Sequence, residues 1–314
     1  MAKNQFAKFK ITPIKLVLLL LGLVGIYSLL PQLHSFNETL AVMRQATWFW
    51  VLLATVAALA TFIVAAITQF AAGNSVGKFF DVVILQFAGA FVNHFLPFSL
   101  AGIGMTEEYY YRLGIKRPQA IVFVTIPVVF GVMTTAAIII IVSPITLVQL
   151  SHSLRISART RAIAIFICIC AIAAILAFPL YKQRLTNALK QAKQGLKGIT
   201  NIRQLIIVVA GSAGITLLGA LALYLSVISV HSSISPVATI ILYITSSLVT
   251  SAAPTPDGLG ATEAALVFGL TRAGLDINQA VASTLFYRFI TVWLPMIPGV
   301  FALKYIDDKQ MLSR

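Results

Sequence analysis

The most constraining feature of this sequence is a series of uncharged apolar runs, each about 20 residues long. A helix rises about 1.5 Å per residue, so a run of this length crosses the ~30 Å hydrocarbon core of a bilayer. Only 10% of the 314 residues are charged, against roughly 25% in soluble domains. The chain is therefore predicted to be an all-α polytopic membrane protein with a single transmembrane domain over residues 1–314, and a water-soluble fold is excluded.

Six of these runs are long enough to be full spans, and two shorter ones are each followed by a break and a second short helix. The six predicted spans cover 12–30, 48–70, 118–142, 160–181, 204–230 and 279–303. The broken segments pair 81–97 with 105–113, and 236–253 with 261–274. We interpret each pair as a re-entrant helical hairpin, which is tolerated at membrane depth only where protein or water surrounds the broken backbone. Two tilted full spans per pair are the alternative.

A short motif occurs twice and indicates an internal duplication. The sequence GIGMTE at 102–107 matches GLGATE at 258–263 at four of six positions, 156 residues apart, and further matches around Gly114 and Gly274 are 160 residues apart. The two repeats then cover about 12–142 and 160–303, each with three transmembrane helices and one re-entrant hairpin. Because three crossings reverse the side of the membrane, the second repeat is expected to be inverted, as in many secondary transporters.

Basic residues predict the orientation, since they collect near the cytoplasmic ends of spans. With the N-terminus inside, 17 of the 23 Lys and Arg residues are cytoplasmic; the others are Arg288 within a span and, outside, Arg44, Arg155, Arg159, Arg161 and Arg272. Both termini are then cytoplasmic, in a plasma (inner) membrane. The loop at 182–203 has six basic residues, no acidic one and no aromatic one. It is expected to be an amphipathic helix on the anionic leaflet, or only a topology determinant, and nucleic-acid binding is not expected.

Two charged residues of the second half lie within or beside apolar segments. Arg288 is near the centre of the last span, and Glu263 opens the second arm of the second hairpin. A charge at this depth costs about 2.5–3.5 kcal/mol on insertion scales, so such residues face the interior and have partners. We predict that they pair. The pair is either a structural clasp or a site where Arg288 engages a lipid phosphate and Glu263 exchanges it or a proton.

Prolines and glycines break the second hairpin just before Glu263. Gly258 and Gly260 place the start of the second arm near Thr262, where free N–H groups favour an anion. Glu263 lies in the same first turn and can satisfy these groups itself. Asp257 is a further candidate for the site, or a residue that only caps its own turn.

The first half offers fewer candidates. Glu107 has the place of Glu263 in the repeated motif, and Glu108 and Arg112 have the spacing of a helical ion pair. The run Tyr109–Tyr111 is interpreted as an interfacial aromatic belt, or as part of the site. The polar pair at 93–94 lies in an apolar arm and is expected to be hydrogen-bonded.

Some small residues have the spacing of packed helices, and the sequence lacks the enzyme motifs that would indicate catalysis. Gly211, Gly214 and Gly219 have the spacing of close helix packing, and Cys168 and Cys170 are interpreted as packing residues. The sequence contains no H-E-x-x-H motif, nucleophile elbow or nucleotide-binding loop. We expect neither catalysis, nor a metal, nor a cofactor, and any movement of a substrate would be uncoupled or driven by an ion gradient.

The segment 254–299 resembles the lysylphosphatidylglycerol synthase transmembrane-domain family, also called flippase-like membrane proteins. In that family a Pro-Gly-Gly-Leu-Gly stretch precedes a Glu, and a Tyr-Arg pair follows in a span. The matching residues here are Pro256, Gly258, Leu259, Gly260, Glu263, Tyr287 and Arg288, and Asp257 stands where the family commonly has Gly. The segment 96–120 resembles the family's other hairpin, with Arg112 near its basic end, but the next segment lacks an arginine often found there.

The resemblance implies a role in handling lipids, because some relatives are fused to an aminoacyl-lipid synthase and translocate its product. No synthase activity is expected of this chain. We expect a flippase-like protein that moves a lipid or lipid-linked head group, with an anionic head group as ligand, between leaflets. The alternatives are a small-solute or ion transporter and an accessory subunit of lipid or glycan assembly with a synthesis partner. The expected path residues are Glu263, Arg288, Glu107, Asp257, Tyr287, Gly258, Gly260, Gly102, Gly104 and Arg112.

Overall fold

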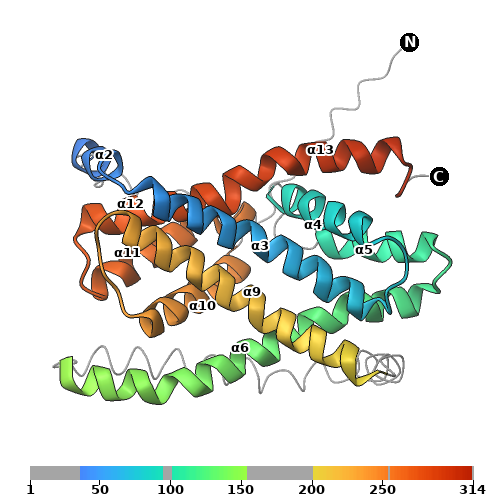
Figure 1. Ribbon diagram of the computed structural model, residues 1–314, viewed down its shortest axis with the longest axis horizontal. Coiled ribbons are helices and arrows are strands. Elements are labelled where there is room, and N and C mark those ends of the chain that lie inside the picture. Colours follow the sequence, from blue (N-terminus) through green and yellow to red (C-terminus); the bar gives the residue numbers. More distant parts are fainter. Residues whose placement is uncertain (1–35, 95–100, 154–200, 254, 313–314) are drawn as a thin grey trace, which may run out of the picture.

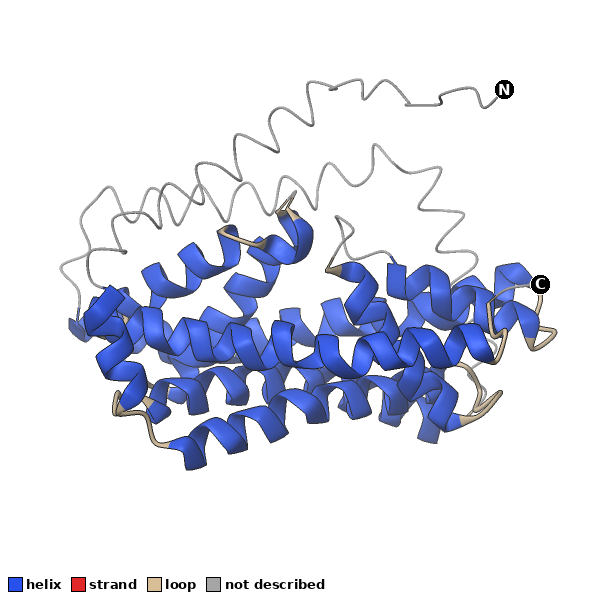
Figure 2. Ribbon diagram, turned by 90° about the horizontal axis from the view of Figure 1, so that it is seen from above, coloured by secondary structure: helices blue, strands red, loops and turns tan. Residues whose placement is uncertain are grey.

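The computed structural model describes residues 36–94, 101–153, 201–253 and 255–312, and these residues form helices and their connections (Figures 1 and 2). The predicted spans at 12–30 and 160–181, with Cys168 and Cys170, lie outside the described residues. So does the predicted amphipathic loop, except for its last three residues, 201–203.

The first half contains α2 (Phe36–Arg44), α3 (Trp48–Ala72), α4 (Phe79–Asn93), α5 (Ala101–Arg112) and α6 (Arg117–Ser153). The second half contains α9 (Ile202–Ser229), α10 (Pro236–Ala252), the 3-10 turn η4 (Pro256–Gly258), α11 (Ala261–Arg272), α12 (Ile277–Arg288), the π turn η5 (Phe289–Trp293) and α13 (Leu294–Asp308). No strand occurs in these described ranges, so the all-helical prediction is confirmed for them.

Four of the predicted spans are present as helices long and apolar enough to cross a membrane. They are Trp48–Ala72, Arg117–Val142, Ile202–Ser229 and Ile277–Asp308. The last of these joins α12, η5 and α13 into one rod. Pro295 has no N–H to donate to the carbonyl of Thr291, and the helix takes its wider π turn next to this missing bond.

The helices α3 and α9 lie side by side across the middle of the molecule (Figure 1). Glycines of α9 allow this approach, since a Cβ on Gly211 would overlap the Thr68 side chain of α3, and one on Gly214 would lie 3.4 Å from Val64. Gly219 is likewise covered by the Tyr243 ring of α10. The predicted role of the three glycines in close helix packing is confirmed.

The short helices of the two broken segments pack in pairs, α4 with α5 and α10 with α11, on either side of α3 and α9 (Figure 1). In the first pair, α4 crosses α5 where Gly89 meets Gly102, and a Cβ on Gly89 would lie only 2.8 Å from the Cα of Gly102. In the second pair, α10 packs against α11, and η4 connects them at the tip.

The predicted aromatic belt at Tyr109–Tyr111 is wrong for its first two residues. Tyr109 and Tyr110 are buried, and the Tyr110 hydroxyl donates a hydrogen bond to the backbone carbonyl of Gln69 at 3.1 Å. Tyr109 donates to Asp81 at 3.1 Å and accepts from the Lys78 backbone N–H at 3.2 Å. Tyr111 alone is exposed, with the Arg117 guanidinium over its ring. Two tyrosines therefore tie α5 to α3 and to the start of α4.

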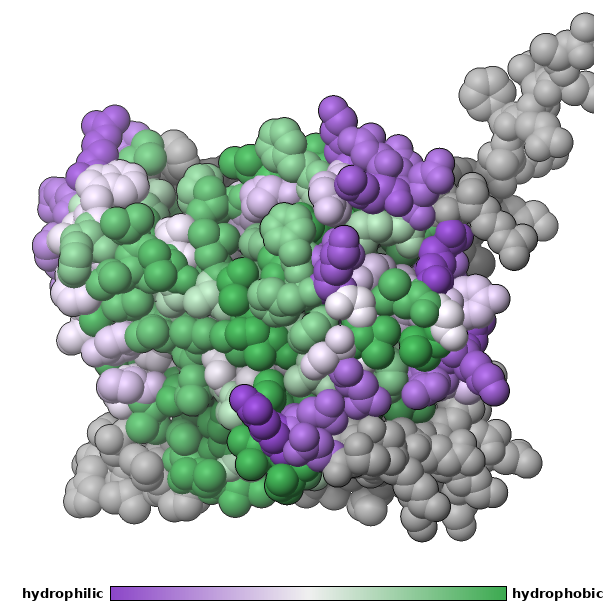
Figure 3. All heavy atoms as spheres, turned by 45° about the vertical axis from the view of Figure 1, so that its right-hand side comes forward, coloured by the Kyte–Doolittle hydropathy of each residue, from purple (hydrophilic) through white to green (hydrophobic). Residues whose placement is uncertain are grey.

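The outer surface has the polarity expected of a membrane protein. Hydrophobic residues cover most of the middle of the face in Figure 3, and hydrophilic residues gather at its upper corners, along its right-hand edge and in a patch at its lower middle. Helix α6 illustrates the pattern, since Val132 and Ile140 are 67% and 70% exposed. Apolar side chains left uncovered along a span-length helix are suited to contact with lipid or with another helix.

Candidate functional site

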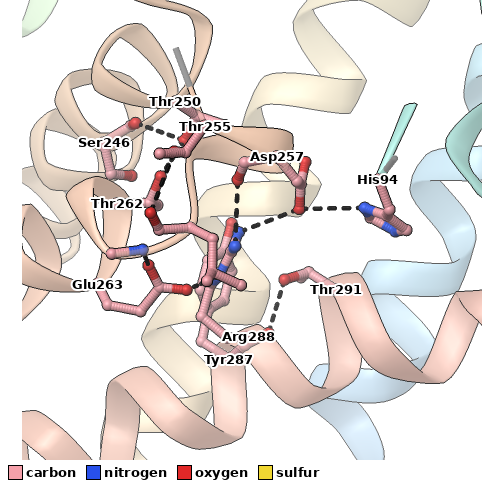
Figure 4. Close-up of polar contacts among 12 residues, drawn as sticks. His94, Ser246, Thr250, Thr255, Asp257, Thr262, Glu263, Tyr287, Arg288 and Thr291 are labelled. Carbon is pink, nitrogen blue, oxygen red and sulfur yellow. Dashed lines mark hydrogen bonds and ion pairs between the residues drawn. The ribbon is translucent and has the colours of Figure 1, made fainter. Parts of the chain in front are cut away.

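The centre of the candidate site is the guanidinium of Arg288, at the C-terminal end of α12 (Figure 4). Its side chain is 8% exposed. Nε donates to Glu263 Oε1 at 2.6 Å, Nη2 donates to the backbone carbonyl of Asp257 at 3.1 Å, and Nη1 lies 3.4 Å from Asp257 Oδ2. The predicted pair of Glu263 and Arg288 is confirmed, and Asp257 joins it as a second carboxylate partner.

The two carboxylate oxygens of Glu263 bind two different parts of the structure. It is the third residue of α11, and its Oε2 accepts a hydrogen bond from the Gly260 backbone N–H at 2.7 Å, which caps the helix start. Its other oxygen binds Arg288. The expectation that Glu263 can satisfy its own helix terminus is therefore confirmed. Glu263 thereby connects the break in the hairpin directly to the last span.

The break itself has positive φ at three of four consecutive residues, Asp257 (φ 50°), Gly258 (φ 65°) and Gly260 (φ 86°). Asp tolerates this region better than most residues with a side chain, and glycine adopts it freely. The Asp257 carboxylate points away from its own turn towards Arg288 and His94 (Figure 4). Asp257 thus contacts the last span as well as shaping η4.

His94 was expected to be hydrogen-bonded, and its partner comes from the other half of the chain. It follows the last residue of α4, is 8% exposed, and places Nδ1 3.3 Å from Asp257 Oδ2. The contact has ion-pair distance, but Nδ1 has no hydrogen bond of good geometry. Its neighbour Asn93 accepts from the Gly102 N–H at 3.4 Å. The one sequence signal for His94 was a polar pair in an apolar arm.

Hydroxyl side chains of α10 and α11 surround the turn. The Thr250 and Thr262 hydroxyls are 2.6 Å apart, and Thr250 also donates to the Ser246 carbonyl at 2.8 Å. A Cβ on Gly258 would lie 2.5 Å from the Thr262 hydroxyl and 2.8 Å from the Thr250 Cα. These hydroxyl residues were not among the site residues predicted from the sequence. Their spacing, with residues 246, 247, 250 and 251 on one face of a helix, was the available signal.

Two cavities meet at Arg288. The first, which we name the lateral groove, has a volume of about 1090 Å³ and lies between α3, α11, α12 and η5. Its walls are mainly apolar, and its polar side chains include Glu263 and Arg288. The second, the polar chamber, has a volume of about 320 Å³ and is lined by Arg288, Asp257, His94, the buried Tyr287 and hydroxyl residues of α10. Arg288 therefore lies between an apolar and a polar compartment.

The first-half candidates lie in a separate charged cluster. Glu108 pairs with Arg112 at 3.1 Å, as predicted, and with Arg117 at 3.0 Å, while Glu107 lies 3.9 Å from Arg117. The helices explain why Glu107 does not reproduce Glu263. Since α5 begins at Ala101 and α11 at Ala261, they correspond at a separation of 160, which places Ile103 opposite Glu263.

The two glycines predicted in the first half, Gly102 and Gly104, do not line the two cavities at Arg288. Gly102 lines a third cavity of about 360 Å³ between α3, α4, α5 and α6. A Cβ on Gly104 would meet no atom within 4 Å. Within the described part of the chain, no three His, Cys, Asp or Glu side chains come together as a metal site.

Comparison with protein families gives a match over most of the chain. No curated protein matches the chain. The family described as the lysylphosphatidylglycerol synthase TM region matches residues 12–299 of the 314. This match includes η4, α11 and α12, which supply Asp257, Glu263 and Arg288. The resemblance seen in the hairpin and the last span thus extends over nearly the whole sequence, and the chain belongs to the lysylphosphatidylglycerol synthase transmembrane-region family.

Proposed function

We propose that this membrane protein moves a lipid or a lipid-linked head group between the two leaflets. The observation that carries the proposal is the position of Arg288, whose side chain lines both the lateral groove and the polar chamber. A translocated lipid has an apolar and a polar part, and each needs a compartment of its own polarity. The guanidinium can bind the phosphate between them.

The residues of the lateral groove fit an acyl chain. Five large apolar side chains line the lateral groove, and each is more than half exposed. They are Trp48, Phe49 and Leu52 of α3 on one side and Phe289 and Trp293 of η5 on the other. Exposed aromatic and aliphatic side chains of this kind contact lipid tails at no desolvation cost. The groove leads to Glu263 and Arg288, so a lipid entering from the bilayer brings its head group to the charged cluster.

We infer that the two halves form an inverted repeat with re-entrant hairpins. The helices α5 and α11 begin and end 160 residues apart, as do the starts of α6 and α12. Gly114 and Gly274 have the same left-handed turn, at φ 88° and 104°. Helices of 12 residues reach only roughly 18 Å at 1.5 Å per residue, well short of the ~30 Å membrane core. Membrane-buried hairpins fit these lengths better than full spans.

This topology predicts where introduced cysteines react. With Cys168 and Cys170 replaced by Ser, Leu113→Cys should react with a membrane-impermeant maleimide from the cytoplasmic side, and Ala273→Cys from the outside. Both positions are exposed turns next to α5 and α11. Thr255→Cys, at the hairpin tip, should be shielded from the cytoplasmic side. Reaction of 113 and 273 from one side would contradict the inversion, and cytoplasmic reaction at 255 would indicate full spans.

The function itself is tested by leaflet exchange of labelled anionic and zwitterionic lipids in proteoliposomes. Glu263→Gln removes one partner of Arg288 but keeps the side-chain shape, and a charge-assisted hydrogen bond contributes about 1.5–3 kcal/mol. We therefore expect exchange to fall about 10- to 100-fold while the protein stays folded. Arg117→Gln is the matched control, because Arg117 is an exposed ion-pair residue with 59% of its side chain accessible. Unchanged exchange in Glu263→Gln would reject this site.

A second candidate function is transport of a small polar solute. The observation that favours it is the third cavity, which carries Gln69, Gln86 and Asn93 and shares Ala90 and Asn93 with the polar chamber. A solute path would run through these polar side chains and leave the lateral groove unused. Solute flux into liposomes in the absence of lipid exchange would favour this candidate.

A further inference from the structure

The charges around Arg288 do not balance. One guanidinium contacts two carboxylates, Glu263 and Asp257, so the cluster carries one excess negative charge when His94 is neutral. All of these side chains are at least 79% buried. A buried charge without compensation is costly. A proton held between His94 and Asp257 would bring the cluster to neutrality.

The two carboxylates differ in whether they have room to bind that proton. Both oxygens of Glu263 accept hydrogen bonds, from Arg288 and from the Gly260 N–H, so a proton there would displace one of these donors. Asp257 Oδ2 lies between Arg288 Nη1 and His94 Nδ1, and the His94 nitrogen is buried with no well-formed hydrogen bond. The His94–Asp257 contact therefore has an open position for a proton. Imidazole is also the side chain that changes charge between about pH 5 and 8.

Binding of an anion to Arg288 increases the imbalance. A phosphate that approaches the Nη atoms competes with Asp257, which already occupies them through its carboxylate and its carbonyl. With the phosphate bound and His94 neutral, three negative charges would share one guanidinium. One proton taken up from water in the polar chamber restores the charge that the cluster had before binding.

We propose that the His94–Asp257 pair is a proton-binding site, and that an anionic phosphate head group binds at Arg288 together with one proton. The proposal rests on the function proposed above and specifies its ligand, a phosphate ester anion, and its energy coupling. Since His94 ends α4 of the first half and Asp257 belongs to η4 of the second, the proton binds where the two halves meet. A proton gradient could then drive head-group loading on one side of the membrane.

The pair and the groups that face it come from five elements. His94 belongs to the end of α4, and Asp257 to η4. Among the described residues, the other titratable or charged side chains that line the polar chamber are Tyr243 of α10 and Tyr287 and Arg288 of α12. Glu263 of α11 contacts the opposite edge of the guanidinium.

The test measures binding and proton uptake together. Purified full-length protein in detergent is titrated with dihexanoyl phosphatidylglycerol, whose phosphodiester keeps a single charge between pH 6 and 8, and a pH indicator in weak buffer counts protons. In the pH range where the free pair is unprotonated, we expect uptake of about one proton per bound lipid and a Kd that rises about tenfold for each unit of increasing pH, because binding of the lipid and of the proton are reciprocally linked. Glycerophosphoglycerol, the same phosphodiester without acyl chains, is the second ligand.

Two substitutions and a matched control complete the design. His94→Asn and Asp257→Asn should both bind lipid without proton uptake and with a Kd that no longer depends on pH. His231→Asn should behave as wild type, since His231 is an exposed histidine whose φ of 57° Asn tolerates. Thermal unfolding of each variant checks the fold. Because either substitution alone removes the pair, one well-folded variant is enough.

The outcomes separate the proton proposal from the proposed function. Lipid binding by wild type with no proton uptake and a constant Kd overturns the proton site, while leaflet exchange can still stand. Failure of phosphatidylglycerol to bind at any pH overturns the head-group role of Arg288 and with it both proposals. Equal binding and proton uptake with glycerophosphoglycerol supports the proton site but makes the ligand a soluble phosphate ester.

Discussion

Arg288→Met is expected to lower the free energy of unfolding by about 3–5 kcal/mol, the cost of removing one partner from a buried ion pair. The physical reason is that Glu263 and Asp257, only 16% and 21% exposed, would face each other without their cation. The bond from Nη2 to the Asp257 carbonyl would be lost as well. The measurement is denaturant or thermal unfolding of the purified protein in mixed micelles, followed by circular dichroism.

A triple variant separates a structural clasp from a functional site. Arg288→Met combined with Glu263→Gln and Asp257→Asn removes all three charges, and replacing a whole buried ion cluster is often neutral or stabilising. We expect it to recover most of the stability lost in Arg288→Met, yet to show no leaflet exchange. Recovery of both stability and exchange would mean that the cluster is only a clasp. A single Arg288→Met variant as stable as wild type would contradict the buried geometry.

Gly258→Ala is expected to lower the free energy of unfolding by about 2–5 kcal/mol. Left-handed backbone costs a residue with a Cβ about 1–2 kcal/mol, and overpacking typically costs a further 1–3 kcal/mol. The new Cβ would lie 2.8 Å from the Thr250 Cα, which is backbone and cannot rotate away. The turn would have to shift, and with it the carbonyl and carboxylate of Asp257 that contact Arg288. Leaflet exchange should therefore fall together with stability.

The matched control is the glycine at the same place in the repeated motif. A Cβ on Gly102 would have its nearest contact at 3.5 Å, with the Cα of Gly89, an ordinary van der Waals distance. Alanine also has a higher helix propensity than glycine. The free energy of unfolding of Gly102→Ala should therefore lie within about 1 kcal/mol of the wild-type value. If both variants lost the same amount of stability, the cause would be the loss of glycine flexibility and not the geometry of η4.

Several features of the fold followed from local sequence properties. The four described spans were predicted close to their observed ends, because length and hydrophobicity determine whether a segment can cross a bilayer. The glycines of α9 were identified as packing residues for a similar reason, since small side chains at helical spacing form a smooth face. The Glu263–Arg288 pair was also predictable, because few charges lie near the apolar segments and each needs a partner.

Other features needed the tertiary structure. Three adjacent tyrosines have the same pattern in an aromatic belt as in a buried anchor. Only the packing of α5 against α4 and α6, with the hydrogen bond from Tyr110 to Gln69 of α3, buries Tyr109 and Tyr110. The repeated motif placed Glu107 at the position of Glu263. The helix begins at a different point of each motif: α5 begins at Ala101, just before the first motif, and α11 begins at Ala261, within the second. The two similar sequences therefore have different backbone structures.

The sequence by itself determined that the chain is a helical membrane protein, which segments can span, and that a buried Glu–Arg pair links the second hairpin to the last span. Tertiary structure decided that Asp257 and His94 join this pair and that Arg288 lies between an apolar groove and a polar chamber. The physical reason is that these contacts join residues that lie far apart in the sequence. Hydrophobicity and helix length depend on residues that are neighbours in the sequence. The contact of His94 with Asp257 depends instead on how the packing of the helices between them places α4 and η4, which belong to different halves.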